Sequence, residues 1–173
     1  MDYYDYYQSP CGRMLLVADD KALTGAYFTG QKYQPRIQEG WKRNARHAPL
    51  RQAKRELAEY FVGKRKRFTV RVAPRGTPFQ RAVWKAIAGV AFGLTVPYAE
   101  VARRAGRPGS ARAAGGATGR NPIGIIVPCH RIVGSNGTLT GYAGGLTKKR
   151  ALLALEGLVK KRVGSCSDER IRS

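Results

Sequence analysis

The feature that most limits how this chain can fold is a change of hydrophobic pattern at Ala73-Pro74-Arg75-Gly76. Before this point, apolar residues fall into short β-like runs followed by a single helical stretch. After it, apolar residues recur every three or four positions, as in helices. Because proline and glycine together are typical of a linker, the sequence predicts an α+β protein of two domains, residues 1–75 and 76–173.

The first domain is predicted to be a small antiparallel sheet with one helix. Three β-like segments separated by turn residues predict a meander: 3–8, 14–18 and 23–28. A helix is expected next and stops at Gly63, because apolar residues recur with helical spacing at Leu50, Ala53, Leu57, Ala58, Phe61 and Val62. Alternation of apolar residues over 68–72 predicts a further strand.

The second domain is predicted to be mainly helical. Thr77 can cap a helix with Pro78 at its first position, and its apolar face would hold Phe79, Val83, Trp84 and Ile87. Two short helices are expected, one opening at Thr95-Val96-Pro97 and running through Ala105, the other over 110–118. Their glycine-containing turn predicts a helix-turn-helix unit. A last helix is expected over 147–156, followed by a fraying tail, Lys160–Ser173.

Positive charge is concentrated in the second domain. The formal net charge is +21, and residues 101–155 carry nine basic side chains and no acidic one. Such a stretch favours a polyanionic partner, because each lysine or arginine on a phosphate releases condensed counterions. Basic runs such as Lys64-Arg65-Lys66-Arg67 can instead simply solvate a surface.

Composition excludes several classes of protein. No apolar run reaches the roughly 20 residues of a membrane-spanning helix, and the first residues lack the pattern of a secretory signal. We therefore expect no membrane partner and a cytoplasmic location. Three cysteines and two histidines do not form a disulfide framework or a four-ligand zinc site, so no metal is expected. We expect Cys11 and Cys166 to be surface thiols without a specific role.

The helix expected over 110–118 has almost no side chains. From Ser110 to Gly119, Arg112 is the one long side chain among alanine, glycine, serine and threonine. Such a surface can pack tightly on protein. Alternatively, it can enter a narrow DNA groove while Arg112 takes the place of an extruded base, with a phosphate at the helix N-terminus near Ser110.

A candidate nucleophile follows an apolar run that ends in Pro128-Cys129-His130-Arg131. The thiolate is the reactive form of cysteine, and a neighbouring base or positive charge increases its population. Adjacent side chains on an extended strand point to opposite faces, so direct contact between Cys129 and His130 would need a turn. We therefore expect a water molecule to relay the proton.

Glu156 is a candidate partner for His130. It follows Leu152 and Leu153 at helical spacing, which places it on the apolar side at the negative end of the last helix. A carboxylate there is costly without a partner, so a buried hydrogen bond to His130 is expected. Pairing of Glu156 with a lysine, and an inert core role for Cys129, are the alternatives.

With these residues in place, the sequence resembles the O6-alkylguanine-DNA alkyltransferases, also called methylated-DNA–protein-cysteine methyltransferases. The resemblance covers most of residues 76–157, whereas residues 1–75 match only in broad pattern. It rests on Gly76-Thr-Pro-Phe-Gln80, Val83-Trp84, Pro97-Tyr98, Arg112, Asn121-Pro122, Ile126-Val-Pro-Cys-His-Arg-Ile-Val133, Gly141-Tyr-Ala-Gly-Gly-Leu146 and Leu152-Leu-Ala-Leu-Glu-Gly157.

The resemblance implies a ribonuclease H-like first domain and a winged-helix-like second domain. It implies direct repair of DNA, in which Cys129 takes the alkyl group from O6 of guanine, and by extension from O4 of thymine, once and without a cofactor. His130 would deprotonate Cys129 through water, Glu156 would orient His130, and Asn121 would hold the turn near the site.

The resemblance also implies the contacts with DNA. The protein would act as a monomer in the minor groove of duplex DNA, with cooperative binding along the strand as an open option. Tyr98 would contact the flipped guanine and its 3′ phosphate, and Arg112 would be the extruding finger. The remaining implied DNA and base contacts are Ser110, Ala111, Ile132, Tyr142, Ala143 and Gly144.

Two departures from the family pattern matter. Many members have a proline where this chain has Gly124, so the pocket is expected to be looser and to admit bulkier alkyl groups. The metal ligands of some members' first domains are absent here.

Two other functions remain open at this stage. A damage-sensing DNA binder of the alkyltransferase-like type would share the helix-turn-helix, but such proteins replace the reactive cysteine, which is present here as Cys129. A Cys-His-Glu hydrolase would use the same residue types for acyl transfer. The basic, acid-free stretch argues against a peptide substrate.

Overall fold

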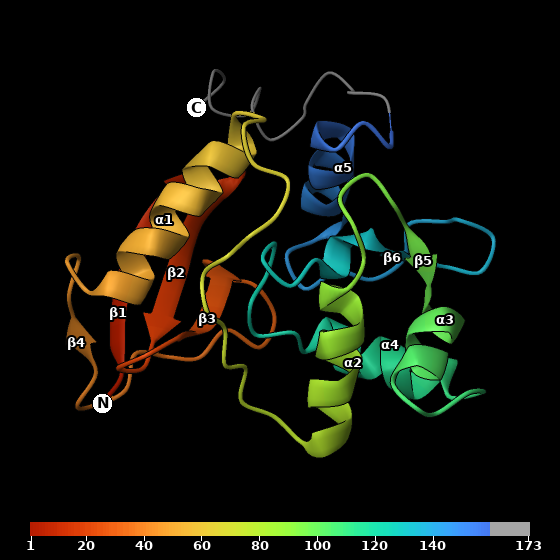
Figure 1. The fold of residues 1–173 in the computed structure, drawn as a ribbon, viewed down its shortest axis with the longest axis horizontal. Helices are drawn as coiled ribbons and strands as arrows, with labels where there is room; N and C mark the ends of the chain where they lie inside the picture. The colour runs from red at the N-terminus through yellow and green to blue at the C-terminus, as the bar shows by residue number, and fades with distance from the viewer. Residues whose placement is uncertain (160–173) are drawn as a thin grey trace.

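The computed structural model describes residues 1–159, and the predicted tail lies outside the described residues. The predicted meander is confirmed: β1 (Tyr3–Ser9), β2 (Gly12–Ala18) and β3 (Leu23–Phe28) pair antiparallel. A two-residue strand that the sequence did not reveal, β4 (Lys42–Arg43), adds parallel to β1, giving the order β3-β2-β1-β4. Helix α1 (Ala48–Phe61) covers this sheet (Figure 1).

The buried face of α1 differs from the predicted face. Leu50, Ala53 and Leu57 are buried as expected, whereas Ala58 is exposed and Val62 is 68% exposed. The face instead continues through Tyr60, because a period of 3.6 residues places 50, 53, 57 and 60 in one row. Gly63 follows the helix with a positive φ of 78°, which is the stop that the sequence predicted.

The strand predicted over 68–72 is wrong. Only Val72 pairs with the sheet, through an isolated bridge to Leu23. The backbone N–H groups of Thr69 and Val70 donate instead to the carboxylate of Glu56 on α1, at 2.9 and 3.1 Å. A side chain therefore satisfies donors that a neighbouring strand would have used, and the alternation reflects local burial of Val70.

The second half of the described chain is mainly helical, as predicted. Its helices are α2 (Pro78–Ala88), α3 (Tyr98–Arg104), α4 (Ala111–Gly119) and α5 (Leu146–Leu155). The predicted cap of α2 is present, since Thr77 and Gln80 form a capping box. Residues 96–97, expected within a helix, form strand β5 (Val96–Pro97), which pairs parallel with β6 (Ile132–Val133). The turn between α3 and α4 matches the predicted helix-turn-helix.

The two halves share one hydrophobic core. The cluster joins Leu16 and Leu57 of the first half to Trp84, Ile123 and many other residues of both. In addition, the backbone of 122–124 hydrogen-bonds to Ala26 of β3, through Ala26 N–H to Pro122 O at 2.8 Å and Gly124 N–H to Ala26 O at 2.9 Å. The division at residue 75 therefore stays a prediction, because packing is continuous across it. None of the described helices is long and apolar enough to cross a membrane.

Candidate active site

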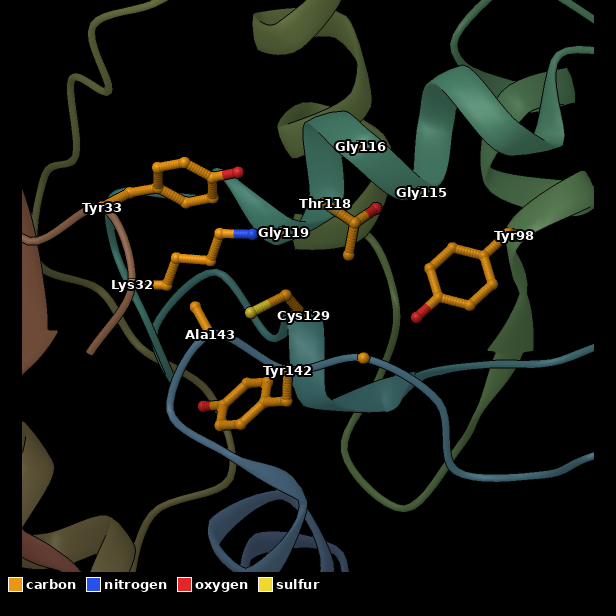
Figure 2. A pocket seen from close by; sticks show the side chains of 11 residues that line it. Lys32, Tyr33, Tyr98, Gly115, Gly116, Thr118, Gly119, Cys129, Tyr142 and Ala143 are labelled. Atoms are coloured by element: carbon orange, nitrogen blue, oxygen red, sulfur yellow. The ribbon is translucent and has the colours of Figure 1, made fainter.

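A cavity of about 370 Å³ opens beside Cys129, within the range typical of small-molecule sites, roughly 300–1,000 Å³. Four of the residues implied by the resemblance line it: Tyr98, Cys129, Tyr142 and Ala143. Figure 2 shows that these side chains come from the start of α3, from the segment ahead of β6 and from the loop before α5. The structure thus brings together residues up to 45 positions apart around one thiol.

Cys129 begins a short 3-10 turn, η1 (Cys129–Arg131), and is 8% exposed. The chain therefore turns at the point where an extended strand would have separated Cys129 from His130. Burial raises the pKa of the Cys129 thiol above its ordinary value, although the Asn121 side chain and the charge of Lys149 lower it. The resting sulfur is thus a thiol, and its reaction requires a base.

His130 is fully buried and meets Glu156 as predicted. Its Nε2 lies 2.8 Å from Glu156 Oε1, and burial lowers the pKa of His130, against the opposing effect of the carboxylate. Hydrogen bonds from His130 and Arg131 lower the pKa of Glu156 to about 2, overcoming the opposing effect of burial, so the carboxylate can only accept. Nε2 must therefore carry the proton, which leaves Nδ1 with a lone pair. Nδ1 is buried and has no hydrogen-bond partner among residues 1–159.

The sequence allowed Arg131 to supply the positive charge beside Cys129, but its side chain points to other partners. Its Nε and Nη2 donate to both oxygens of Glu156 at 2.9 and 2.8 Å, and its Nη1 donates to the Val90 carbonyl at 2.7 Å. The fork geometry of a guanidinium makes this a bidentate pair that fixes the carboxylate plane. Glu156 thus holds both residues that follow Cys129.

Asn121 ties down the segment that leads to the cysteine. Its side chain donates to the Val127 carbonyl at 2.8 Å and accepts the Ile123 N–H at 3.0 Å. The neighbouring Gly124 is not among the residues that line the cavity, and its N–H bonds to β3. A proline at 124 could not make that bond. The structure therefore gives no support to the expectation that Gly124 loosens the pocket.

Lys149 is a site residue that sequence reasoning missed, because a lysine on a helix is usually solvated. It is fully buried, and its three protons are all used: Nζ donates to the carbonyls of Ile132, Thr140 and Gly141 at 2.6, 2.8 and 3.2 Å. Tyr98 Oη also donates to the Thr140 carbonyl, at 3.0 Å. Burial lowers the pKa of Lys149 to about 8. Lys149 therefore anchors the loop that carries the pocket wall.

The first half of the chain also contributes to the cavity. Lys32 and Tyr33, in the loop after β3, also line it, and Figure 2 shows Lys32 extending toward Gly119 in the same space as Cys129. The centroid of the Tyr33 ring lies 5.0 Å from Lys32 Nζ and 4.4 Å from the Arg120 guanidinium. No lining residue is acidic. The sequence offered no signal for this loop, because its position depends on tertiary contacts.

The small-residue helix α4 forms another wall. Gly115, Gly116 and Gly119 line the cavity, and a Cβ at Gly116 would meet nothing within 4 Å, so this face is open. Trp84 Nε1 donates to the Ala117 carbonyl at 2.8 Å and fixes the helix to α2. Arg112 is exposed on its first turn. The helix thus presents an accessible surface with one long cation.

The remaining predicted residues lie outside the cavity lining. Ser110 is the N-cap residue of α4 without a side-chain cap bond, and Ala111 follows it. Ile132 is buried, and its carbonyl accepts from Lys149. A Cβ at Gly144 would come within 3.0 Å of Phe28 on β3, so glycine allows a close contact between the pocket loop and the sheet.

With this geometry in place, comparison with known proteins identifies the family. The model of the 6-O-methylguanine DNA methyltransferase DNA-binding domain matches residues 78–158, and that of the ribonuclease-like domain of the same enzymes matches residues 3–74. The chain belongs to this family. It thereby belongs to the methylated-DNA–protein-cysteine methyltransferases, DNA repair enzymes that transfer an alkyl group to a cysteine.

Relatives in the family align over nearly their whole length. A methylated-DNA–protein-cysteine methyltransferase of Methanosarcina acetivorans is 45% identical over 155 residues, 90% of this chain and 98% of the relative. One of Mycolicibacterium paratuberculosis is 44% identical over 153 residues, 88% and 91% of the two chains. The crystal structure of Mycobacterium tuberculosis OGT in complex with DNA is 42% identical, with a TM-score of 0.81 over 89% of this chain and 92% of that one.

Proposed function

We propose that Cys129 is the alkyl acceptor and that it removes the alkyl group from O6 of guanine, and from O4 of thymine, in duplex DNA. The observation that carries this proposal is the hydrogen bond between His130 Nε2 and Glu156, because it leaves a basic Nδ1 on the residue next to a buried thiol. Family membership supplies the reaction class.

The proposed reaction begins with proton transfer. The Cys129 S–H proton passes through a water molecule to His130 Nδ1, and Glu156 stabilises the resulting imidazolium. The sulfur then attacks the alkyl carbon, so that a C–S bond forms while the bond from carbon to O6 breaks. The electron pair stays on the guanine, which takes up a proton from solvent at N1, and His130 returns to its neutral form by releasing the thiol proton to water. Asn121 and Lys149 act on this step by holding the segments that surround the sulfur.

The cavity walls would position the base. Tyr98, Tyr142 and Ala143 line the cavity beside Cys129, where they would contact the base. The backbone of Ile132, outside the lining, would contact its edge. Outside, α4 would lie in the minor groove, with Arg112 in the place of the extruded nucleotide and Ser110 and Ala111 against a phosphate. Gly144 would let the pocket loop stay close to the sheet.

Each molecule should act once, because the product is a thioether, and the proposed chemistry regenerates no thiol. No cofactor takes part in the proposed steps. We propose further that the protein acts as a monomer, that neighbouring copies can bind DNA cooperatively, and that it works in the cytoplasm.

Peptide mass spectrometry after incubation with a duplex that contains O6-methylguanine tests the proposal. Wild-type protein should carry one methyl group on Cys129 per lesion repaired, and Cys129→Ala should bind the duplex without transfer. Binding without transfer by the wild type would indicate a damage sensor, and turnover of an ester would indicate a hydrolase. Repair of many lesions by one molecule would also contradict the proposal.

A further inference from the structure

The side chain of Tyr60 reaches the carboxylate of Glu156 from the other half of the molecule. Tyr60 lies on α1, is fully buried, and its hydroxyl donates to Glu156 Oε1 at 2.8 Å, across 96 positions of sequence. Its ring also packs edge-on against Phe92, with centroids 6.4 Å apart, and Phe92 lies beneath the Arg131 guanidinium. Tyr60 therefore contacts the network of Glu156 through a hydrogen bond and through an aromatic ring.

Oxygen Oε1 of Glu156 is crowded with donors. It accepts from Tyr60 Oη, His130 Nε2 and Arg131 Nη2, all at 2.8 Å, whereas Oε2 accepts only Arg131 Nε among the described residues. Three donors on one oxygen share its electron density, so each weakens the others. The tyrosine hydroxyl thus competes directly with His130 for the same oxygen.

We propose that Tyr60 is a positioning residue for alkyl transfer: its hydroxyl holds Glu156 in place and limits how strongly this carboxylate stabilises protonated His130. This inference rests on the proposed function of His130 as the base. Through Tyr60, the first domain sets the pH range in which the base is neutral and able to accept the proton of Cys129.

Tyr60→Phe itself removes none of the charged or titratable groups that face His130 and Glu156. Arg131 and Lys149 disfavour the imidazolium, Glu156 favours it, and Cys129 and Cys11 are the neighbouring thiols. Burial, followed by the charge of Glu156, raises the pKa of Tyr60 far above its ordinary range, so the hydroxyl keeps its proton and remains a donor. Its loss leaves Oε1 with two donors, and the bond to His130 strengthens. The pKa of His130 then rises.

The test is the pH dependence of single-turnover methyl transfer from an O6-methylguanine duplex, measured from pH 9 downward until the acid limb is complete. Neutral His130 is the active form, so the rate falls on the acid side as His130 takes up a proton. In Tyr60→Phe this acid limb should move to higher pH by about half a unit, a threefold change in the protonation equilibrium of His130. The rate above the limb should change less than the rate within it.

Leu50→Val is the matched control, because Leu50 is buried on the same helix and makes no hydrogen bond to the network. It should lower thermal stability while its acid limb coincides with that of the wild type. A limb in Tyr60→Phe that coincides with the wild type, or an equal shift in Leu50→Val, overturns the proposal. Absence of transfer by the wild type at every pH would instead refute the proposed function.

Discussion

The two halves of this protein use their carboxylates in opposite ways. In the first half, the carboxylates hold segments of the fold together. Asp2 pairs with Arg75, and Asp5 pairs with Arg43 and Lys54. Glu56 accepts hydrogen bonds from backbone N–H groups. Between residues 76 and 159 there are only two carboxylates. Glu100 pairs with Arg103 and Arg104 at the surface, whereas Glu156 is buried with His130 and Arg131.

The carboxylates of the first half stabilise the fold, whereas Glu156 also contacts the proposed base, His130. Exposed ion pairs, such as that of Glu100 with Arg103, contribute little each, and their loss is tolerated, whereas the buried carboxylates Asp5 and Glu56 serve the fold. A buried carboxylate that neutralises an arginine and orients a histidine cannot be replaced without leaving a charge unpaired. The comparison therefore predicts that equivalent substitutions in the two settings have very different effects.

Glu156→Gln should give the largest effect, because it keeps the shape but leaves Arg131 buried without its counter-charge. We expect a loss of about 3–5 kcal/mol in the free energy of unfolding, measured by chemical denaturation. Transfer should also slow strongly, since His130 loses its negative partner. Glu100→Gln is the control, and it should change neither stability nor transfer measurably. Equal effects of the two substitutions would remove the distinction between the two carboxylates.

The buried setting of Glu156 should also make the free energy of unfolding depend on pH. Since the pKa of Glu156 is lowered from 4.5 to about 2 in the folded protein, its stabilisation is complete above pH 4.5 and is lost as the pH falls toward 2. The unfolded chain takes up the proton first, so unfolding becomes easier in this window. The free energy of unfolding should therefore fall more steeply between pH 4.5 and pH 2 in the wild type than in Glu156→Gln.

How far the sequence could predict the molecule also differs between the halves. The meander, α1, α2 and the bond from His130 to Glu156 followed from local pattern, because amphipathic period and an otherwise costly buried carboxylate are visible in the chain. Tyr60 was not on the predicted apolar face of α1, and nothing in its sequence context pointed to a polar partner for its hydroxyl. Its contact with Glu156 depends on how α1 packs on the second half.

Other features could not be predicted from the sequence for related reasons. Lys149 could not be recognised as buried, because its three acceptors are backbone carbonyls, of β6 and of the loop before α5, which leave no trace in the side-chain pattern. The false strand over 68–72 arose because Glu56 replaced a strand as hydrogen-bond partner. Strand β4 contains two polar residues and no alternating pattern at all. In each case a tertiary partner determined the local structure.

Arg112→Ala should give the next largest effect, because Arg112 is exposed and its proposed role is in base extrusion rather than in folding. We expect transfer from duplex DNA to slow about ten- to a hundredfold, which corresponds to part of the few kcal/mol that extrusion costs. Transfer from free O6-methylguanine base should be unchanged. Arg55→Ala removes the same charge from α1, and its ratio of duplex to free-base rates should equal that of the wild type. An unchanged ratio in Arg112→Ala would refute the extrusion role.

Lys32→Ala should give the smallest effect, and it tests whether the first half touches the DNA at all. Lys32 lines the cavity beside Cys129, and no carboxylate in residues 1–159 pairs with its ammonium group. If it meets a phosphate near the lesion, its loss should weaken duplex binding a few-fold and reduce the slope of log affinity against log salt by about one. Lys21→Ala, in the turn between β2 and β3, should leave the slope unchanged. An identical slope in Lys32→Ala would confine DNA contact to the second half, and the first half would then act on the reaction only through Glu156.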